Sequence, residues 1–461
     1  MGEEIDAVFD PSTGEEIARV PRFGRRETER AIGAAVAAFP AWSGLLAKER
    51  SAVLRRWFDL TMANLEALAV LLTSEQGKPL SEARSEIAYA ASFVEFYAEE
   101  AKRIYGETVP SHIRDGRIVV LRQPVGVVAA VTPWNFPAAM VTRKLAPALA
   151  AGCTVVLKPA PETPLTALAL AALAEQAGIP PGVLNVVAGD ASEIGATLCE
   201  SPDVRALTFT GSTAVGRLLM TQCAHTVKRL GLELGGNAPF IVFDDADMDA
   251  AVEGAIASKY RNSGQTCICA NRFYVQDAVH DTFVRALAVE TAKLRVGDGR
   301  EEGVQIGPLI NERAVAKVER HILDAVAKGG RIALGGKRHG DSGNFFEPTI
   351  IEGARAEMRV ASEEIFGPLA PVFRFRDEHE VVRLANATRS GLAAYFYTRD
   401  LGRVWRVAEA LEYGMVGINS ALLSTEQAPF GGTKESGLGR EGSRHGMEEF
   451  LEPKYLLVAG I

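Results

Sequence analysis

Residues 261–273, RNSGQTCICANRF, place two cysteines, Cys267 and Cys269, one residue apart among small and polar side chains. A thiol in such a segment can be a metal ligand, half of a disulfide, a small core residue or a nucleophile. A thiolate is the most nucleophilic side chain near neutral pH, so the last role would give the protein covalent chemistry. The choice among these four roles decides what the protein does.

The remaining sulfur and imidazole side chains argue against a metal site and against a disulfide framework. The chain of 461 residues contains five cysteines and seven scattered histidines. A structural zinc site needs four Cys or His ligands, usually as two close pairs, and Cys267 and Cys269 have no second pair. We therefore expect no metal. The surroundings of Cys153, Cys199 and Cys223 are typical of small buried hydrophobes.

Charge and hydropathy patterns exclude further classes. The formal charge of −8 and the lack of a basic run argue against nucleic acid or an anionic membrane as the main partner. The N-terminal stretch MGEEIDAVFDPSTGEE is acidic and lacks an apolar signal region, and apolar patches such as 145–152 are too short to cross a bilayer. We expect a cytoplasmic protein that acts on a small molecule.

The periodicity of apolar residues predicts helices first and α/β units afterwards. The first hundred residues are predicted to be helical, with apolar residues at three- and four-residue spacing over 27–39, 49–73 and 80–106. A β-rich segment follows at 117–134, and strands alternate with helices over 138–232 and again from 238 to about 420. This alternation predicts parallel sheets in two or three domains. The tail, 452–461, is expected to form a last strand that pairs with 117–131 or with another subunit.

Three strand ends have the chemistry of a nucleotide or oxyanion site. LTFTGSTAVG ends a strand at Gly211 and Ser212 and opens a helix, where free N–H groups favour phosphate. VVLKPAPETP places Lys158 at a strand's carboxyl end, where a ribose or phosphate contact would lie. In VTPWNFP, two prolines fix Asn135, whose amide could donate to an oxyanion. Each has a plainer alternative: an N-cap, a solvated lysine, a rigid turn.

The segments PWNFP, KPA, FTGS, LELGGNAPFIV, GQTC, EEIFGP and PFGG-K-SG follow one another along the chain. Their order resembles that of the aldehyde dehydrogenase superfamily over nearly the whole length, and most closely its succinate-semialdehyde dehydrogenases. The resemblance implies an α/β, aldehyde dehydrogenase-like fold with a Rossmann-like cofactor domain (1–107 and 128–235), an α/β catalytic domain (236–447) and a small β oligomerisation element (108–127 and 448–461). It also implies a homo-oligomer, a dimer or tetramer, in which the tail strand joins a neighbouring subunit.

The family's functional residues can be carried over position by position. By that resemblance Cys267 is the nucleophile, Glu233 the general base and Asn135 the side-chain oxyanion donor, while Cys269 is a possible redox partner of the nucleophile. The substrate carboxylate is expected to bind Arg143, Arg261 and Ser424. The implied cofactor site comprises Trp134, Asn135, Lys158, Pro159, Ala160, Pro161, Gly211, Ser212, Leu234, Glu364 and Phe366.

The chemistry of aldehyde oxidation explains why such side chains are needed. A thiolate adds to the aldehyde carbon, donors stabilise the resulting oxyanion, hydride leaves to the nicotinamide, and a carboxylate activates the water that cleaves the thioester.

The cofactor preference is expected to follow one position near Lys158. Family members that prefer NAD commonly carry Glu three residues after this lysine. Here Pro161 stands there, followed by Glu162, and the missing carboxylate favours NADP, with NAD possible. The expected activity is therefore NADP-preferring oxidation of succinate semialdehyde. Alternatives are glutarate semialdehyde or another aldehyde as substrate, a CoA-acylating enzyme, and a non-catalytic thiol redox protein.

Overall fold

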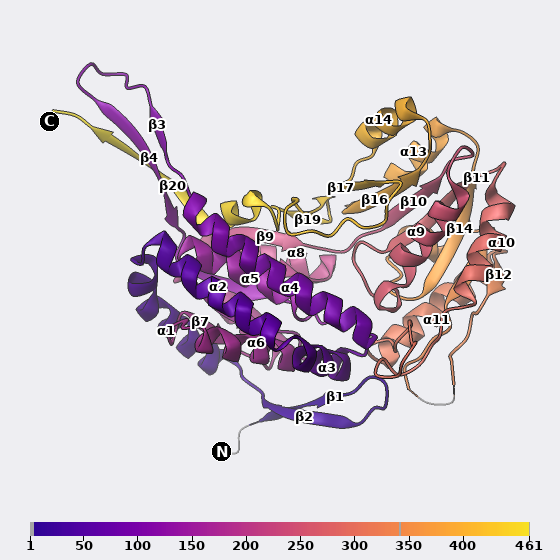
Figure 1. Cartoon of the computed structure of the whole chain (residues 1–461), viewed down its shortest axis with the longest axis horizontal. Helices are drawn as coiled ribbons and strands as arrows, with labels where there is room; N and C mark the ends of the chain where they lie inside the picture. Colours follow the sequence, from indigo (N-terminus) through magenta and orange to yellow (C-terminus); the bar gives the residue numbers. More distant parts are fainter. Residues whose placement is uncertain (1–3, 341–342, 461) are drawn as a thin grey trace.

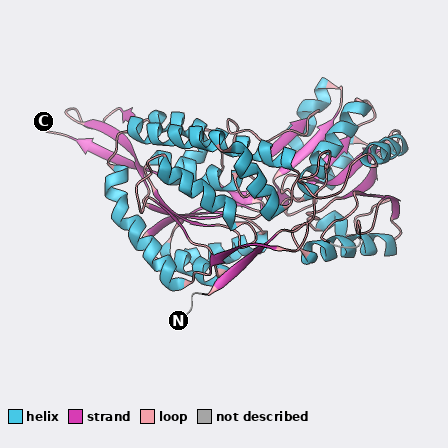
Figure 2. Cartoon of the chain, turned by 60° about the horizontal axis from the view of Figure 1, so that its bottom comes forward, coloured by secondary structure: helices cyan, strands magenta, loops and turns pink. Residues whose placement is uncertain are grey.

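Two mostly parallel sheets form the body of the molecule in the computed structural model, which describes residues 4–340 and 343–460. One sheet has the strand order β19-β9-β8-β5-β6-β7 and the other the order β12-β13-β14-β11-β10-β16-β17 (Figure 1). Neighbouring strands run parallel except at the β19–β9 and β12–β13 edges. Helices lie against the strands (Figure 2). The predicted α/β fold class is confirmed.

The first sheet changes direction next to β5. From β5 the chain moves outward through β6 and β7 and then returns to the other side of β5 as β8, where Val131 pairs with Phe209. The carboxyl ends of β5 and β8 therefore meet at a topological switch point, the place where α/β sheets bind ligands. The elements are β5 (Val127–Val131), α5 (Ala139–Ala151), β6 (Thr154–Lys158), α6 (Pro164–Gln176), β7 (Leu184–Val186), α7 (Ala191–Glu200), β8 (Val204–Thr210), α8 (Thr213–Cys223), β9 (Arg229–Glu233) and β19 (Gly437–Leu438).

The second sheet is covered on both faces. Along β10, Phe240 and Val242 join one apolar cluster while Ile241 joins the other, because successive strand residues point to opposite faces. Its elements are β10 (Ala238–Val242), α9 (Met248–Tyr260), β11 (Ala270–Gln276), α10 (His280–Thr291), α11 (Glu312–Ala327), β12 (Arg331–Leu334), β13 (Thr349–Glu352), α12 (Arg359–Ser362), β14 (Leu369–Phe375), α13 (Glu378–Asn386), β16 (Ala393–Tyr397), α14 (Leu401–Ala410) and β17 (Met415–Ile418).

The N-terminal region differs in part from the helical prediction. The helices are α1 (Arg25–Ser43), α2 (Ala47–Ala63), α3 (Leu65–Gln76) and α4 (Leu80–Glu100). The predicted helix over 49–73 is two helices, divided at Asn64. A hairpin, β1 (Ile5–Phe9) and β2 (Glu16–Pro21), precedes them, so helix throughout this region was wrong. Five- and six-residue strands give too short a pattern to stand out beside long helices.

A three-stranded arm projects from the body and carries the C-terminal end of the chain (Figure 1). In it, β20 (Leu451–Val458) pairs antiparallel with β4 (Arg117–Pro124), and β4 pairs with β3 (Glu107–Val109). The prediction that the tail pairs with the 117–131 segment is confirmed; Ile461 lies outside the described residues. Within the described ranges no single helix meets the length and hydropathy needed to cross a bilayer, and only the bent pair α1–α2 does so jointly.

Candidate active site

Cys267 lies in the connection between a short 3-10 turn, η3 (Arg261–Gly264), and β11. This turn requires an unusual backbone, since Asn262 and Ser263 both have positive φ, 51° and 55°. Gly264 follows with φ of 75°, and a Cβ there would lie 2.2 Å from the carbonyl oxygen of Gly367. The loop is therefore held in one shape against the segment that follows α12, which brings Cys267 to a cavity of about 360 Å³.

The Cys267 cavity opens at the switch point of the first sheet. Trp134 and Asn135 follow β5, and Gly211 and Ser212 follow β8, as the strand–turn–helix patterns predicted. The predicted residues that line the cavity are Trp134, Asn135, Gly211, Ser212, Leu234, Cys267, Glu364 and Phe366. The structure thus brings the thiol, the amide donor and much of the expected cofactor site together.

Several contacts fix the walls of this cavity. The Trp134 and Phe366 rings meet edge to face with centroids 5.5 Å apart. The Glu364 carboxylate accepts the backbone N–H of Gly236 at 3.0 Å. Gly236 itself passes close to the nucleophile loop, because a Cβ there would lie 2.3 Å from the Cys267 carbonyl oxygen.

The helix α8 gives the cavity an anion-binding end. The Ser212 hydroxyl caps α8 by accepting the Val215 N–H at 3.4 Å, and the dipole of the helix favours negative charge there. A cavity lined by this helix N-terminus and by Glu364 and Phe366 fits a dinucleotide with its pyrophosphate on α8.

The other predicted cofactor residues lie at the edge of the site. Lys158 ends β6, is buried and donates to the Pro159 carbonyl at 2.9 Å. Burial lowers the pKa of Lys158, although Glu162 opposes this shift. Lys158, Pro159 and Ala160 do not line the Cys267 cavity; Pro161 lines an adjoining groove of about 640 Å³, and Glu162 borders both spaces.

Asn135 is anchored from both its side chain and its backbone. The side-chain Nδ2 donates to the Gln265 carbonyl at 3.0 Å, and the Asn135 carbonyl accepts from Lys78 and Asn262. A carboxamide has two N–H donors. One of them therefore fixes the amide against the loop of Cys267, and the second is left for an oxyanion in the cavity.

The environment of Cys267 favours its neutral thiol. Burial, reinforced by the nearby Glu364, raises the pKa of Cys267 to about 12, while the positive charge of Arg143 opposes the shift. The thiol must lose its proton before it can add to a carbonyl.

Glu233 also prefers its neutral form. Burial, and secondly the charge of Glu441, raise the pKa of Glu233 well above its usual value. Neither carboxyl oxygen has a hydrogen-bond partner among the residues described. Glu233 lines a small space behind the Cys267 cavity together with Arg143 and Glu441. A carboxyl without fixed partners is free to turn and to exchange a proton.

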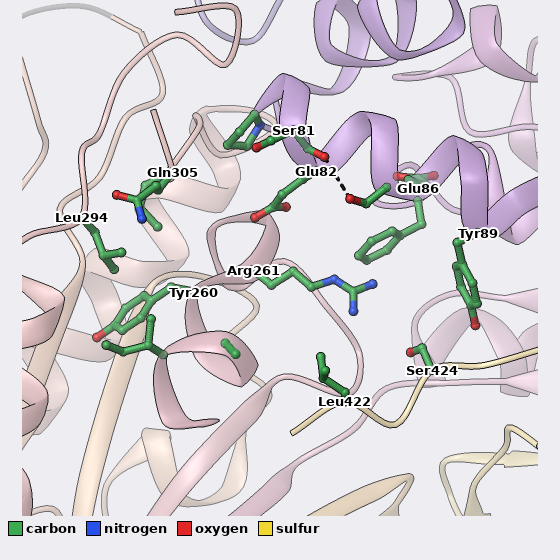
Figure 3. Close-up of a pocket in the computed structure, with 16 residues that line it drawn as sticks. Ser81, Glu82, Glu86, Tyr89, Tyr260, Arg261, Leu294, Gln305, Leu422 and Ser424 are labelled. Atoms are coloured by element: carbon green, nitrogen blue, oxygen red, sulfur yellow. Dashed lines mark hydrogen bonds between the residues drawn. The ribbon is translucent and has the colours of Figure 1, made fainter. Parts of the chain in front are cut away.

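The three residues expected to bind a carboxylate are only partly brought together. Arg261 and Ser424 line a pocket of about 570 Å³, and the guanidinium of Arg261 extends toward Ser424 and Tyr89 (Figure 3). Arg143 does not line this pocket. It stacks over Phe430 at 3.9 Å, and its Nε lies 2.9 Å from Glu441.

Cys269 is not poised to form a disulfide with Cys267. Its thiol donates to the Lys259 carbonyl at 3.3 Å, and both Cys267 and Cys269 are free thiols. Burial raises the pKa of Cys269. A redox partnership with Cys267 remains a prediction that would require this hydrogen bond to break.

Sequence reasoning missed three polar residues that contact the site, namely Tyr89, Lys78 and Asn262. Tyr89 stands at helical spacing in α4, where an aromatic side chain usually packs in the core. Lys78 follows Gly77 between two helices and looks like a solvated turn residue. Asn262 stands within the cysteine segment 261–273, and its residue type, which tolerates the left-handed backbone found there, was the one available signal.

A switch-point cleft with a half-buried thiol beside it suits an α/β enzyme that combines a dinucleotide site with covalent thiol chemistry. The chain belongs to the aldehyde dehydrogenase family, whose profile, "Aldehyde dehydrogenase family", matches residues 2–456. The predicted superfamily resemblance is confirmed.

Individual relatives are similar over nearly their whole length. A glutarate-semialdehyde dehydrogenase of Pseudomonas aeruginosa is 63% identical, covering 98% of this chain and 94% of the relative. The Escherichia coli K12 succinate-semialdehyde dehydrogenase (NADP+) GabD is 61% identical, covering 99% and 95%. The crystal structure of a succinate-semialdehyde dehydrogenase from Burkholderia pseudomallei superposes with a TM-score of 0.98 at 63% identity, covering 99% of this chain and 95% of that one.

Proposed function

We propose that this aldehyde dehydrogenase oxidises succinate semialdehyde to succinate with NADP as the preferred cofactor. One observation carries the substrate assignment: donors converge beside the pocket without an acceptor. Within the described ranges, the Arg261 guanidinium forms no hydrogen bond or ion pair and lies over the Phe136 ring at 4.9 Å. The Tyr89 hydroxyl, which lines the same pocket, likewise has no hydrogen-bond partner.

Such a cluster calls for an anion. Buried donors without acceptors cost about 1–3 kcal/mol each, and a carboxylate accepts several hydrogen bonds at once. A semialdehyde has its carboxylate a few bonds from the aldehyde. The Arg261 pocket therefore suits the carboxylate while the aldehyde carbon reaches Cys267.

The proposed chemistry assigns one role to each polar group. Cys267 releases its proton to water and its sulfur bonds to the aldehyde carbon. The carbonyl oxygen becomes an oxyanion that accepts from the free N–H of Asn135 and from the Cys267 backbone N–H. When bound, the nicotinamide supplies the hydride acceptor for that carbon. Glu233, as carboxylate, then takes a proton from the water that cleaves the thioester on Cys267 and releases the acid.

We propose that Trp134, Gly211, Ser212, Leu234, Glu364 and Phe366 hold the cofactor, with Lys158 to Pro161 at its adenosine end. Because Pro161 cannot repel a 2′-phosphate, NADP should give a higher kcat/KM than NAD. The charge of Glu162, which borders the cavity, works in the opposite direction. Replacing Glu162 by Gln should therefore raise kcat/KM for NADP further and leave that for NAD within about twofold. A higher kcat/KM with NAD in the unchanged protein would contradict the assignment.

We propose the domain division of the resemblance: a cofactor domain at 1–107 and 128–235, a catalytic domain at 236–447, and an oligomerisation element at 108–127 and 448–461. The two large sheets and the arm support it, although β19 of the 236–447 segment returns to the first sheet. The arm supports a homo-oligomer, since β20 and β3 are edge strands that expose apolar side chains.

The experiment that tests the substrate assignment replaces Arg261 by Ala. A charged hydrogen bond contributes about 1.5–3 kcal/mol, so KM for succinate semialdehyde should rise about ten- to a hundredfold. KM for butanal, which has no carboxylate, should change less than about twofold, and Arg261→Lys should restore part of the loss. Equal losses with both aldehydes would remove the anchoring role of Arg261.

A second substrate is favoured by the similarity to a glutarate-semialdehyde dehydrogenase. Glutarate semialdehyde is one methylene longer, and one methylene discriminates by only about 1–3 kcal/mol. Its kcat/KM relative to that of succinate semialdehyde decides between the two.

A further inference from the structure

The backbone of the oxyanion donor is held by a buried lysine. The Asn135 carbonyl accepts the Lys78 ammonium at 2.8 Å and the Asn262 side-chain amide at 2.9 Å. Both oxygen lone pairs are thus used. These two bonds fix the backbone of Asn135, whose side-chain amide donates to the Gln265 carbonyl in the loop of Cys267.

Lys78 is tied to the second turn of α4 by an ion pair. Its ammonium lies 2.5 Å from Glu86 and 3.8 Å from the centre of the Phe136 ring, and neither charged side chain is more than 1% exposed. The second oxygen of Glu86 accepts the backbone N–H of Ala138 at 2.9 Å, just before α5 begins. The pair therefore holds the Pro-Trp-Asn-Phe-Pro turn through the Asn135 carbonyl and the Ala138 N–H, on either side of Phe136.

Asn262 completes the connection from the nucleophile side. Its Nδ2 is shared between the carbonyls of Asn135 and Gln265, at 2.9 and 3.2 Å, and its Oδ1 accepts from Gln76 at 3.0 Å. Its backbone N–H donates to Glu82 at 2.8 Å. The junction between α3 and α4 thus contacts both the oxyanion turn and the loop of Cys267.

We propose that Lys78, paired with Glu86, is a positioning residue for the oxyanion donor Asn135. The inference rests on the proposed role of Asn135 in catalysis. A donor must lie within about 0.5 Å of its productive position to stabilise a developing oxyanion. Burying an ion pair costs desolvation free energy, and the buried Lys78–Glu86 pair contacts the backbone carbonyl of the donor residue Asn135.

The test uses a neutral variant, Lys78→Met with Glu86→Gln, because removing one partner alone would leave a buried charge. The readouts are kcat and KM for the aldehyde, KM for the cofactor and the melting temperature, in chains with and without Asn135→Ala. We expect the neutral pair to lower kcat about ten- to a hundredfold for succinate semialdehyde and for butanal alike, with cofactor KM within about twofold.

Non-additivity separates positioning from general destabilisation. Asn135→Ala should cost about a hundred- to a thousandfold in rate, and adding the neutral pair to it should cost less than about twofold more. Two results would overturn the positioning role of Lys78 but not the oxyanion role of Asn135. One is that the neutral pair lowers kcat as much in the Asn135→Ala background as in the unchanged protein; the other is that the neutral variant keeps its kcat. A loss below about tenfold from Asn135→Ala would overturn the oxyanion role as well. If the neutral variant does not fold, Lys78→Arg replaces it, because arginine keeps the positive charge and shifts the N–H groups that hold the Asn135 carbonyl. We expect the same loss of kcat alone and the same absence of a further loss beside Asn135→Ala.

Discussion

The Cys267 thiol has to be activated, because burial raises its pKa to about 12. At pH 7 to 9 the thiolate fraction should then rise about tenfold per pH unit. We predict that inactivation by iodoacetamide, in protein without cofactor, accelerates in this proportion over that range. Cys267→Ser should abolish the modification that accompanies inactivation. A rate that levels off below pH 9 would show that the thiol is already activated in the free enzyme.

The Tyr89 hydroxyl is the donor beside Arg261 that sequence reasoning missed. It lies on α4 and faces Ser424 across the pocket (Figure 3). Tyr89→Phe keeps the edge-to-face packing on Phe93, whose ring centre is 5.0 Å away, and removes only the oxygen. We predict about a tenfold higher KM for succinate semialdehyde and less than a twofold change for butanal. The matched change at the exposed Tyr105 should alter neither value; a KM increase shared by both aldehydes would assign Tyr89 to packing.

At the residue scale, the sequence was informative where chemistry and backbone geometry coincide. Cys267 and Asn135 stand in short segments of small residues and prolines, and the structure brings both to one cavity. Tyr89 and Lys78 could not be predicted as site residues, because their helical or turn context is equally typical of packing and solvation. Arg143 shows the reverse: its position matched, but the side chain lies behind the pocket against Glu441.

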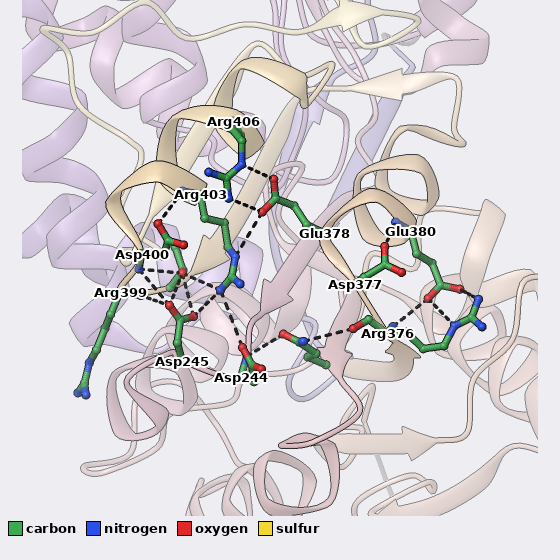
Figure 4. A network of polar contacts seen from close by, with 12 residues as sticks. Asp244, Asp245, Arg376, Asp377, Glu378, Glu380, Arg399, Asp400, Arg403 and Arg406 are labelled. Carbon is green, nitrogen blue, oxygen red and sulfur yellow. Dashed lines mark hydrogen bonds and ion pairs between the residues drawn. The ribbon is translucent and has the colours of Figure 1, made fainter.

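At the scale of elements, an ion-pair network joins the ends of the second sheet to two helices (Figure 4). Asp245, just after β10, accepts from the Thr398 hydroxyl at 2.8 Å, from Arg403 at 2.7 Å and from the N–H of Asp400 at 3.0 Å. Arg403 in turn lies 3.5 Å from Glu378 of α13. The network ties β10 and β16 to α13 and α14.

Replacing Asp245 by Asn should loosen this junction. The amide nitrogen would face donors, so at least one hydrogen bond is lost at a cost of about 1–3 kcal/mol in the free energy of unfolding. Urea unfolding measures the change, and Asp249→Asn on the exposed side of α9 is the control, expected within about 0.5 kcal/mol. If the two variants unfold at the same urea concentration, the network does not stabilise the fold.

Element type was predictable where periodicity is long. The strand–helix alternation after residue 138 predicted the parallel sheet, and the Gly211–Ser212 junction lies between β8 and α8 as expected. The β1–β2 hairpin and the break at Asn64 were not predicted. A short strand gives few repeats of its two-residue pattern, and a helix that restarts after one residue leaves the apolar spacing almost intact.

At the scale of the whole molecule, the arm is the feature that a single chain explains least. Tyr455 and Leu457 stand two residues apart on one face of β20 and are 56% and 41% exposed. Exposed apolar side chains on an edge strand favour pairing with another subunit. The sequence pattern placed the tail strand beside 117–131, but the number of subunits depends on surfaces that one chain does not complete.

Leu457→Glu should therefore weaken the proposed homo-oligomer. We predict a lower mass in sedimentation equilibrium, because a carboxylate would be buried without a partner at the subunit contact. Leu401→Glu on α14, where the side chain is 73% exposed, is the matched control and should leave the mass unchanged. An unchanged mass for Leu457→Glu would place the contact elsewhere.

The central claim is that the pocket containing Arg261 selects an aldehyde with a distal carboxylate. The most direct measurement is the kcat/KM for succinate semialdehyde divided by that for butanal, followed by the absorbance of reduced NADP in the unchanged protein. We predict a ratio of about ten to a hundred, since each charged hydrogen bond contributes about 1.5–3 kcal/mol. A ratio near one would contradict the claim and leave Cys267, Asn135 and Glu233 as the site of an aldehyde dehydrogenase without preference for a carboxylate.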